Sequence, residues 1–354
     1  MKFSPNYIFS VLVAVLLLNG HGLKGQDAHF TQYYQVPAYV NPALVGNFNG
    51  LFKVGMNYRD QWRPALDRPY ATFTATGESK FLVGQRDPDV AALGIMFFSD
   101  QISKYDLNTT QIALTGSYHK LLDKKTKQYI GLGYQAAIFQ KSLNYEDLTF
   151  GDQFNAIDAY SNETLEILPG NNLGFFDMSL GVDYSYTSTS DKEFNAGISV
   201  FHLTSPNISF FAQEDQVDKD LNINAVLDPR WSAHASYSLP TSDAFSFQTR
   251  ALFMSQDQHK LYVLSTLFTY KNPRSEGKKF YFGPAFRFSN RLDKTSLEAV
   301  MLTIGYDFKG LNLGLSYDYN TNDLFNDRYG MSTFEVSINY FGQYENADAF
   351  CPTF

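Results

Sequence analysis

The stretch FDMSLGVDYSY, from Phe176 to Tyr186, alternates strictly between apolar and polar or small side chains. Its apolar positions are Phe176, Met178, Leu180, Val182, Tyr184 and Tyr186. Its polar or small positions are Asp177, Ser179, Gly181, Asp183 and Ser185. A period of two residues indicates a β-strand with one apolar face and one polar face. Strands of soluble proteins usually have about 5–6 residues, whereas a tilted strand needs about ten to cross a bilayer. This stretch therefore favours a membrane strand.

The same alternation returns at residues 130–138, 300–308, 311–320 and 333–340. Aromatic side chains stand at the ends of the apolar faces, as Phe176 and Tyr186 do. At about 3.3 Å per residue and a tilt near 40°, these two lie roughly 25 Å apart along the membrane normal, which is the height between two aromatic girdles. After residue 25 the chain has no apolar run long enough for a membrane helix.

We therefore predict an all-β fold, a transmembrane antiparallel β-barrel of about 14 strands over residues 51–342, with both termini in the periplasm. Strands are expected near 51–60, 69–80, 90–99, 107–119, 128–140, 174–187, 193–203, 230–239, 243–256, 260–271, 279–288, 297–308, 311–320 and 331–342. With the N-terminus in the periplasm, the connections after the odd-numbered strands lie outside the cell. These include 61–68, 141–173, 204–229, 289–296 and 321–330. The turns at 188–192, 240–242 and 309–310 then face the periplasm, and they are shorter, as membrane barrels require.

The remaining segments lie at the two ends of the chain. Residues 1–25 are predicted to be a signal peptide, with Lys2 before a twelve-residue apolar run and cleavage between Gly25 and Gln26. A short membrane anchor is the alternative. Residues 26–50 are expected to be an extended periplasmic segment, and residues 343–354 a C-terminal tail.

Composition argues against several classes of function. The net charge of −8 has the wrong sign for a nucleic-acid binder, so no nucleic acid is expected as a partner. Nucleophile-elbow, zinc-protease and phosphate-loop motifs are absent from the sequence, and a single cysteine rules out an internal disulfide. We expect no enzyme, no cofactor and no metal site. The histidines after the leader share no ligand spacing: His29, His119, His202, His234 and His259.

Two features of the barrel leave alternatives open. The inward faces are largely Ser, Thr, Gly, Asn and Asp, with Arg59, Arg250 and Arg287, which suits either a water-filled channel or a lumen filled by the chain itself. One outer connection carries oxygen ligands that calcium prefers, although a solvated polar loop is the favoured interpretation because the spacing matches no known calcium loop. These side chains are Asp152, Asn155, Asp158, Asn162 and Glu163.

The two ends of the mature chain carry the most specific patterns. After the predicted cleavage site the chain reads QDAHFTQYY, then Pro37, then NPALVG from Asn41 to Gly46, and it ends CPTF. Aromatic side chains at this density are normally buried or bound, so we expect them in the lower barrel mouth or on a partner. Asn41 is expected to bond backbone beside the Pro42 turn. The candidate residues are His29, Phe30, Gln32, Tyr33, Tyr34, Pro37, Asn41, Pro42, Ala43, Gly46, Cys351, Pro352 and Phe354.

These ends resemble the PorP/SprF family, whose mature chains begin like Q-D-x-H-F-x-Q, continue to N-P-A-x-x-G and commonly end C-P-x-F. Ala28 departs from the proline that the family often has there. The resemblance implies an outer-membrane barrel of the type IX secretion system of Bacteroidetes, often tied to gliding motility. It also implies three partners: a secreted surface adhesin with a type IX C-terminal domain, secretion components including periplasmic lipoproteins, and outer-membrane lipid.

The leading interpretation is a non-enzymatic barrel that holds or helps to export a surface protein. The alternatives are an outer-membrane channel for small solutes and a soluble secreted adhesin. Cys351 would either pair with a cysteine of a partner in the oxidising periplasm or stay reduced in a buried tail, and the second is favoured.

Overall fold

The computed structural model describes residues 27–63, 68–84, 88–102, 106–146, 148–155, 157, 160–166, 168–213, 225–273, 277–291, 294–321 and 332–342. The predicted leader and the predicted C-terminal tail, with Cys351, Pro352 and Phe354, lie outside these residues. So does Asp158 of the acidic outer connection.

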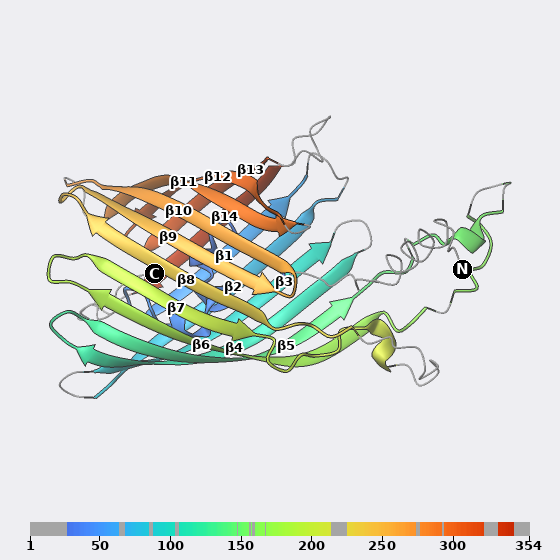
Figure 1. Ribbon diagram of the computed structural model, residues 1–354, viewed down its shortest axis with the longest axis horizontal. Coiled ribbons are helices and arrows are strands. Elements are labelled where there is room, and N and C mark those ends of the chain that lie inside the picture. The colour runs from blue at the N-terminus through green and yellow to red at the C-terminus, as the bar shows by residue number, and fades with distance from the viewer. Residues whose placement is uncertain are drawn as a thin grey trace, which may run out of the picture.

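In the described part of the chain, fourteen antiparallel strands form one closed barrel, in which each strand pairs with its neighbours in sequence and β1 pairs with β14 (Figure 1). The strands are β1 (Phe52–Gln61), β2 (Tyr70–Val83), β3 (Asp89–Ile102), β4 (Leu107–Asp123), β5 (Gln128–Ser142), β6 (Asn172–Thr187), β7 (Glu193–Phe201), β8 (Arg230–Pro240), β9 (Phe245–Gln256), β10 (His259–Lys271), β11 (Lys278–Arg291), β12 (Lys294–Phe308), β13 (Leu311–Asn320) and β14 (Ser332–Gly342). This architecture confirms the predicted barrel and its strand number. No helix in the described part of the chain is long and apolar enough to cross a membrane.

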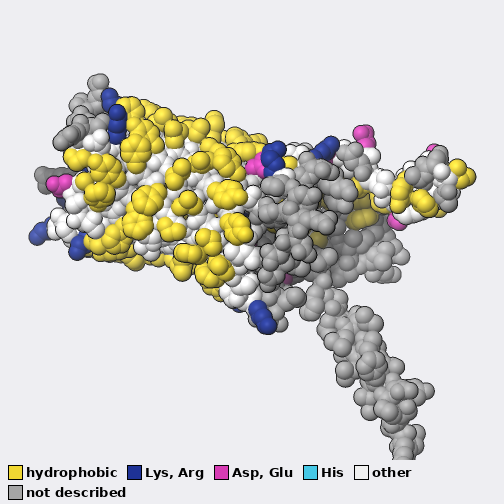
Figure 2. Space-filling model, turned by 90° about the horizontal axis from the view of Figure 1, so that it is seen from above, with side chains coloured by type: hydrophobic (Ala, Val, Ile, Leu, Met, Phe, Trp, Pro, Cys, Tyr) yellow, Lys and Arg dark blue, Asp and Glu magenta, His cyan; other side chains and the backbone are white. Residues whose placement is uncertain are grey.

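The alternating pattern sorts side chains between the two faces of the wall as predicted. Leu180 is 42% exposed on the outside while its neighbour Ser179 is 3% exposed on the inside. Ile338 and Ser337 differ in the same way, at 47% and 1%. Figure 2 shows hydrophobic side chains spread over the barrel wall, with charged side chains near its ends. An apolar outer band on a closed barrel is the surface that lipid covers in the outer membrane.

The two ends of the barrel differ in their connections. The end where odd-numbered strands finish, here the long-loop end, carries the connections 143–171 and 202–229. The short-turn end carries tight connections such as 188–192 and Lys309–Gly310. The outer connection expected at 289–296 is mostly strand, because the β11–β12 ladder continues to the pair Arg291 and Lys294.

Residues 27–50 lie inside the barrel, and we call them the plug. They form three short helical elements, η1 (Tyr33–Gln35), α2 (Pro37–Val40) and η2 (Pro42–Leu44). The expectation of an extended periplasmic segment over residues 26–50 is therefore wrong for the described residues, in conformation and in position. In a closed lumen, backbone polar groups must find partners within the protein, and short turns supply part of them.

Candidate functional site

The apolar side chains of the plug form the main core of the protein. Phe30, Tyr33, Tyr39 and other plug residues pack against lumen-facing residues of the wall such as Phe98. Tyr39 stacks on Phe98 with ring centroids 5.4 Å apart, and Phe30 meets Tyr39 edge-on at 5.3 Å. Aromatic pairs in these geometries add to the stabilisation from burial alone. The plug is thus packed into the lumen as a structural element.

Asn41 anchors the middle of the plug. Its side-chain Nδ2 donates to the carbonyl oxygens of Val182 (3.0 Å) and Ile198 (3.2 Å), and its Oδ1 accepts from the backbone N–H of Ala43 (2.9 Å). This is the backbone bonding beside the Pro42 turn that was expected of Asn41. Because all three bonds go to main chain, they fix the position of the turn against strands β6 and β7.

Glycines in the wall make room for this turn. A Cβ at Gly133 would lie 2.2 Å from the backbone nitrogen of Ala43 and 2.3 Å from the carbonyl carbon of Pro42. A Cβ at Gly181 would lie 1.8 Å from Oδ1 of Asn41. Only a residue without a side chain allows the plug backbone to come this close to the wall.

A buried cluster of charges joins the plug to the seam of the barrel. Glu335 on β14 accepts from the backbone N–H groups of Thr31 (2.7 Å) and Gln32 (2.9 Å). Arg59 on β1 pairs with Glu335 at 3.2 Å and with Asp318 on β13 at 3.3 Å. Both acids are fully buried. Buried charges need such partners, since an unpaired one carries a large desolvation cost.

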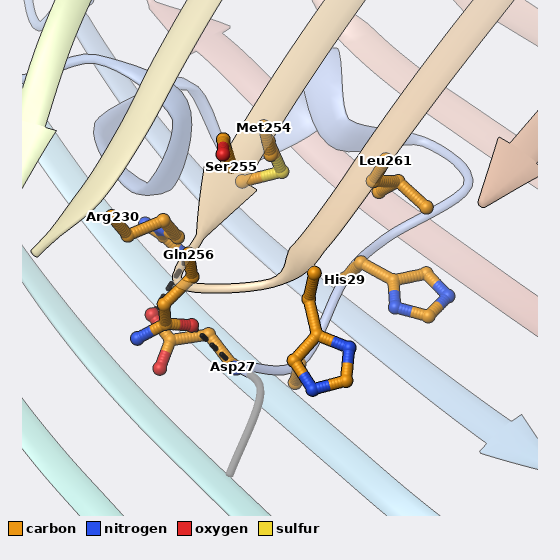
Figure 3. A pocket seen from close by; sticks show the side chains of 9 residues that line it. Asp27, His29, Arg230, Met254, Ser255, Gln256 and Leu261 are labelled. Atoms are coloured by element: carbon orange, nitrogen blue, oxygen red, sulfur yellow. Dashed lines mark hydrogen bonds and ion pairs between the residues drawn. The ribbon is translucent and has the colours of Figure 1, made fainter. Parts of the chain in front are cut away.

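Asp27 is held by a second charged cluster at the long-loop end. His202 bridges two carboxylates, with Nε2 2.7 Å from Asp27 and Nδ1 2.7 Å from Asp177. Arg230 pairs with Asp27 at 3.0 Å, and Figure 3 shows Asp27 beside Arg230 and Gln256. Burial alone would lower the pKa of His202, but the Asp27 charge and both carboxylate contacts outweigh it and raise the pKa to about 9. His202 is therefore an imidazolium at neutral pH.

The pKa of Asp27 moves in the opposite direction. Burial alone would raise it, but the His202 and Arg230 charges hold it far below the usual range. The cavity beside Asp27 and His29 has a volume of about 10 Å³. That is room for about one water, so a small organic substrate does not fit there.

A third group of contacts holds the plug at the short-turn end. Lys53 donates to the carbonyl oxygen of Gln35 and to Glu78, both at 3.2 Å. Glu78 also accepts from the backbone N–H of Gly46 at 3.0 Å. Just before β1, the backbone N–H of Leu51 donates to the carbonyl of Gly342.

These contacts give the plug a direction. The chain enters at the long-loop end with Asp27, folds within the lumen, and leaves at the short-turn end beside Gly342. The two ends of the described chain therefore lie at opposite ends of the barrel. The expectation that the whole segment before β1 lies on the side where β14 ends is therefore wrong for Asp27, although Leu51, directly before β1, does lie beside Gly342.

The other sequence-predicted residues are placed as follows. Phe30 and Tyr33 lie in the core. The guanidinium carbon of Arg250 lies 3.9 Å from the ring centroid of Tyr34. Pro37 is the first residue of α2. The side chain of Gln32 contacts Ser337 and the backbone of Glu335. His29 lines the small cavity, and Gly46 has φ +82°, which favours glycine. In the outer connection Asp152 caps its own loop by accepting from Leu165 and Thr164.

Sequence reasoning did not find the contacts made by Glu335, Asp318, Asp177, His202 and the lumen glycines. The first three are acids on the inward face of a strand, which alternation alone locates. Their partners lie on other segments, from 25 residues away for Asp177 to 304 for Glu335, so nothing local signals which of them are paired.

The lumen is filled rather than open along the wall that the plug covers. Inward-facing polar side chains have almost no exposed surface, including Asn57, Gln135, Asp183, Asp318 and Glu335. In a water-filled pore the same side chains would be hydrated. The sequence left open whether the lumen is a water-filled channel or is filled by the chain itself, and the described residues favour the second.

The model of the family "Type IX secretion system membrane protein PorP/SprF" matches residues 22–340. The chain belongs to this family. The match includes the plug and all the strands up to β14, so the residues described above lie within the part that the family shares. A comparison with curated proteins gives no match.

The chain is similar to several solved structures. A FadL homologue from Pseudomonas aeruginosa has a TM-score of 0.48 and 13% identity, with 86% of this chain and 94% of that chain covered. The CymD monoaromatic hydrocarbon channel has a TM-score of 0.45 and 13% identity, with 90% of this chain and 95% of that chain covered. BamA from Haemophilus ducreyi has a TM-score of 0.41 and 8% identity, with 83% of this chain and 71% of that chain covered.

Proposed function

We propose that this PorP/SprF protein is a plugged, non-enzymatic barrel that acts by binding other proteins of the type IX system. It would hold or help to export a secreted surface adhesin at the long-loop end. At the short-turn end it would contact secretion components, including periplasmic lipoproteins. Membership of the PorP/SprF family supports a role in the type IX secretion system.

The observation that carries the proposal is the burial of the inward-facing polar residues against the plug. A channel for small solutes needs a hydrated path, and its lining would be exposed. Here the inward acids are used in ion pairs with the wall and in hydrogen bonds to the plug backbone. Binding through the two ends is then the function left to the barrel.

Conductance of the purified protein in a planar bilayer tests the closed lumen. The wild-type protein should give no steady ohmic current, whereas a variant lacking residues 27–46 should conduct. Steady ohmic current from the wild-type protein would contradict the proposal and favour a solute channel, whether or not the deletion variant assembles.

Surface display tests the role in secretion. Cells that lack the protein should lose surface exposure of its cognate secreted protein, measured by antibody binding to intact cells. Full display without the barrel would refute the proposed function.

A further inference from the structure

The described parts of the two longest connections form a structure of their own beyond the barrel wall. Residues 143–171 follow β5 and residues 202–229 follow β7, and Figure 1 shows the described parts of both projecting past the strand ends. Each contains an isolated antiparallel β-bridge between its own residues. One joins Phe154 to Tyr160, and the other joins Asn207 to Val226. The described parts are thus folded against themselves.

An apolar cleft of about 470 Å³ lies between these connections. Its wall includes Leu148, Phe150 and Leu168 from the first connection and Ile208, Phe210 and Phe211 from the second. Close to it in sequence, Ile157 is 92% exposed and Leu165 is 89% exposed. Large apolar side chains left in water beyond the lipid band mark an interaction surface.

The charge of the two connections is strongly one-sided. Residues 143–171 contain six Asp and Glu and no Lys or Arg, and residues 202–229 contain five Asp and Glu against Lys219 and the buried His202. Glu166 is itself part of the cleft wall. A second copy of this face would be repelled, because its described acids Glu146, Asp152, Glu163 and Glu166 carry the same negative charge.

We infer that the cleft is the docking site for a positively charged protein surface that presents an apolar anchor. This inference rests on the proposed function, and it names the chemistry of the surface-protein contact. The apolar anchor would fill the cleft, and Lys or Arg side chains around it would face Glu163 and Glu166. Charge attraction would speed encounter, while burial of the anchor would slow release.

Binding of a fluorescent peptide to the full-length protein in lipid nanodiscs tests the inference. The probe alternates Lys with Leu and Phe, and its matched control has Glu in place of every Lys. Wild-type protein should bind the Lys probe, more weakly at high salt, and should not bind the Glu probe. Equal binding of both probes would overturn the inference.

Two kinds of variant separate charge from apolar contact. The pair Glu163→Lys and Glu166→Lys should weaken binding of the Lys probe at least about tenfold, whereas Asp243→Lys in the β8–β9 turn at the other end should change it little. Phe150→Ser with Phe211→Ser should also weaken binding at high salt, where attraction is screened. Unchanged affinity in either set would refute the docking site.

Display on cells distinguishes this inference from the proposed function. The loop variants should reach wild-type levels in the outer membrane and keep the fast-migrating folded band on unheated gels. They should nevertheless lose display of the cognate protein. Normal display in these variants, together with loss of display when the whole barrel is absent, would reject the cleft and leave the proposed function standing.

Discussion

The backbone N–H of Thr31 donates to the carboxylate of Glu335 at 2.7 Å, across 304 residues of sequence. Thr31 belongs to the plug and Glu335 to the last strand, which closes the barrel by pairing with β1. The other carboxylate oxygen accepts from the backbone N–H of Gln32 and from Asn57 on β1. One side chain therefore joins the plug to both strands of the closing seam.

Glu335→Gln should destabilise the barrel by about 3 kcal/mol or more, because it leaves Arg59 short of a buried partner and sets an amide N–H against a backbone N–H. The temperature at which the folded band disappears on SDS gels measures the loss. Asp106→Asn is the matched control, since it removes an exposed ion pair with Arg68 and should cost at most about 1 kcal/mol. Equal shifts in both variants would contradict the role of the seam cluster.

Gly133→Ala should displace the plug turn, because the new Cβ would overlap backbone atoms of Pro42 and Ala43. We expect a loss of about 1–3 kcal/mol in the same gel assay. Gly116→Ala is the control, since the nearest atom to its Cβ would be Leu93 Cδ2 at 3.9 Å. Its stability should stay within about 0.5 kcal/mol of the wild type. A harmless Gly133→Ala would mean that the turn does not lie against this strand.

Arginine on the lipid face should impair assembly. Leu180→Arg and Ile338→Arg are each expected to cost about 2–4 kcal/mol near the membrane midplane. Leu180→Ile should assemble normally, and the yield of folded protein in outer-membrane fractions measures the difference. The inward serines do not serve as tolerant controls for arginine, because Ser337 is buried and donates to Gln32 Oε1 at 2.8 Å.

The contact between His202 and Asp27 should weaken at high pH. A folded pKa of about 9, above the ordinary value of 6.5, gives stability that is complete below about pH 6.5 and lost as pH rises through 9. The wild type should therefore be more stable than His202→Gln at pH 7, and the gap should close by about pH 10. Thermal unfolding of both proteins across this range measures it, and a gap that is constant with pH would rule out the charged His202.

The direction of the barrel in the membrane can be tested with epitope tags. A tag inserted between Asn162 and Glu163 should be reached by antibodies on intact cells. A tag in the turn Ser188–Asp191 should be reached only after the outer membrane is permeabilised. The reverse labelling would place the long-loop end in the periplasm and would move the proposed docking cleft there.

The sequence by itself determined the wall of the barrel. Alternation at positions such as Leu180 and Ser179 sets which face each residue takes, because lipid accepts only one of the two faces and closure leaves no edge. Fourteen such stretches fix the strand number, and the motif around Asn41 and Pro42 marked the segment that proved to be the plug. The chemistry of Asn41 was also readable, since an amide beside proline in a turn bonds to nearby backbone.

Only the tertiary structure decided what fills the lumen and in which direction the plug runs through it. A polar inward face suits water as well as protein, so residues such as Glu335 and Asp318 do not reveal their partners from local sequence. Their pairing with Arg59 and the plug depends on strand register around the whole barrel, which joins positions about 300 residues apart. The same holds for His202 and for Gly133, whose roles exist only because the plug passes beside them.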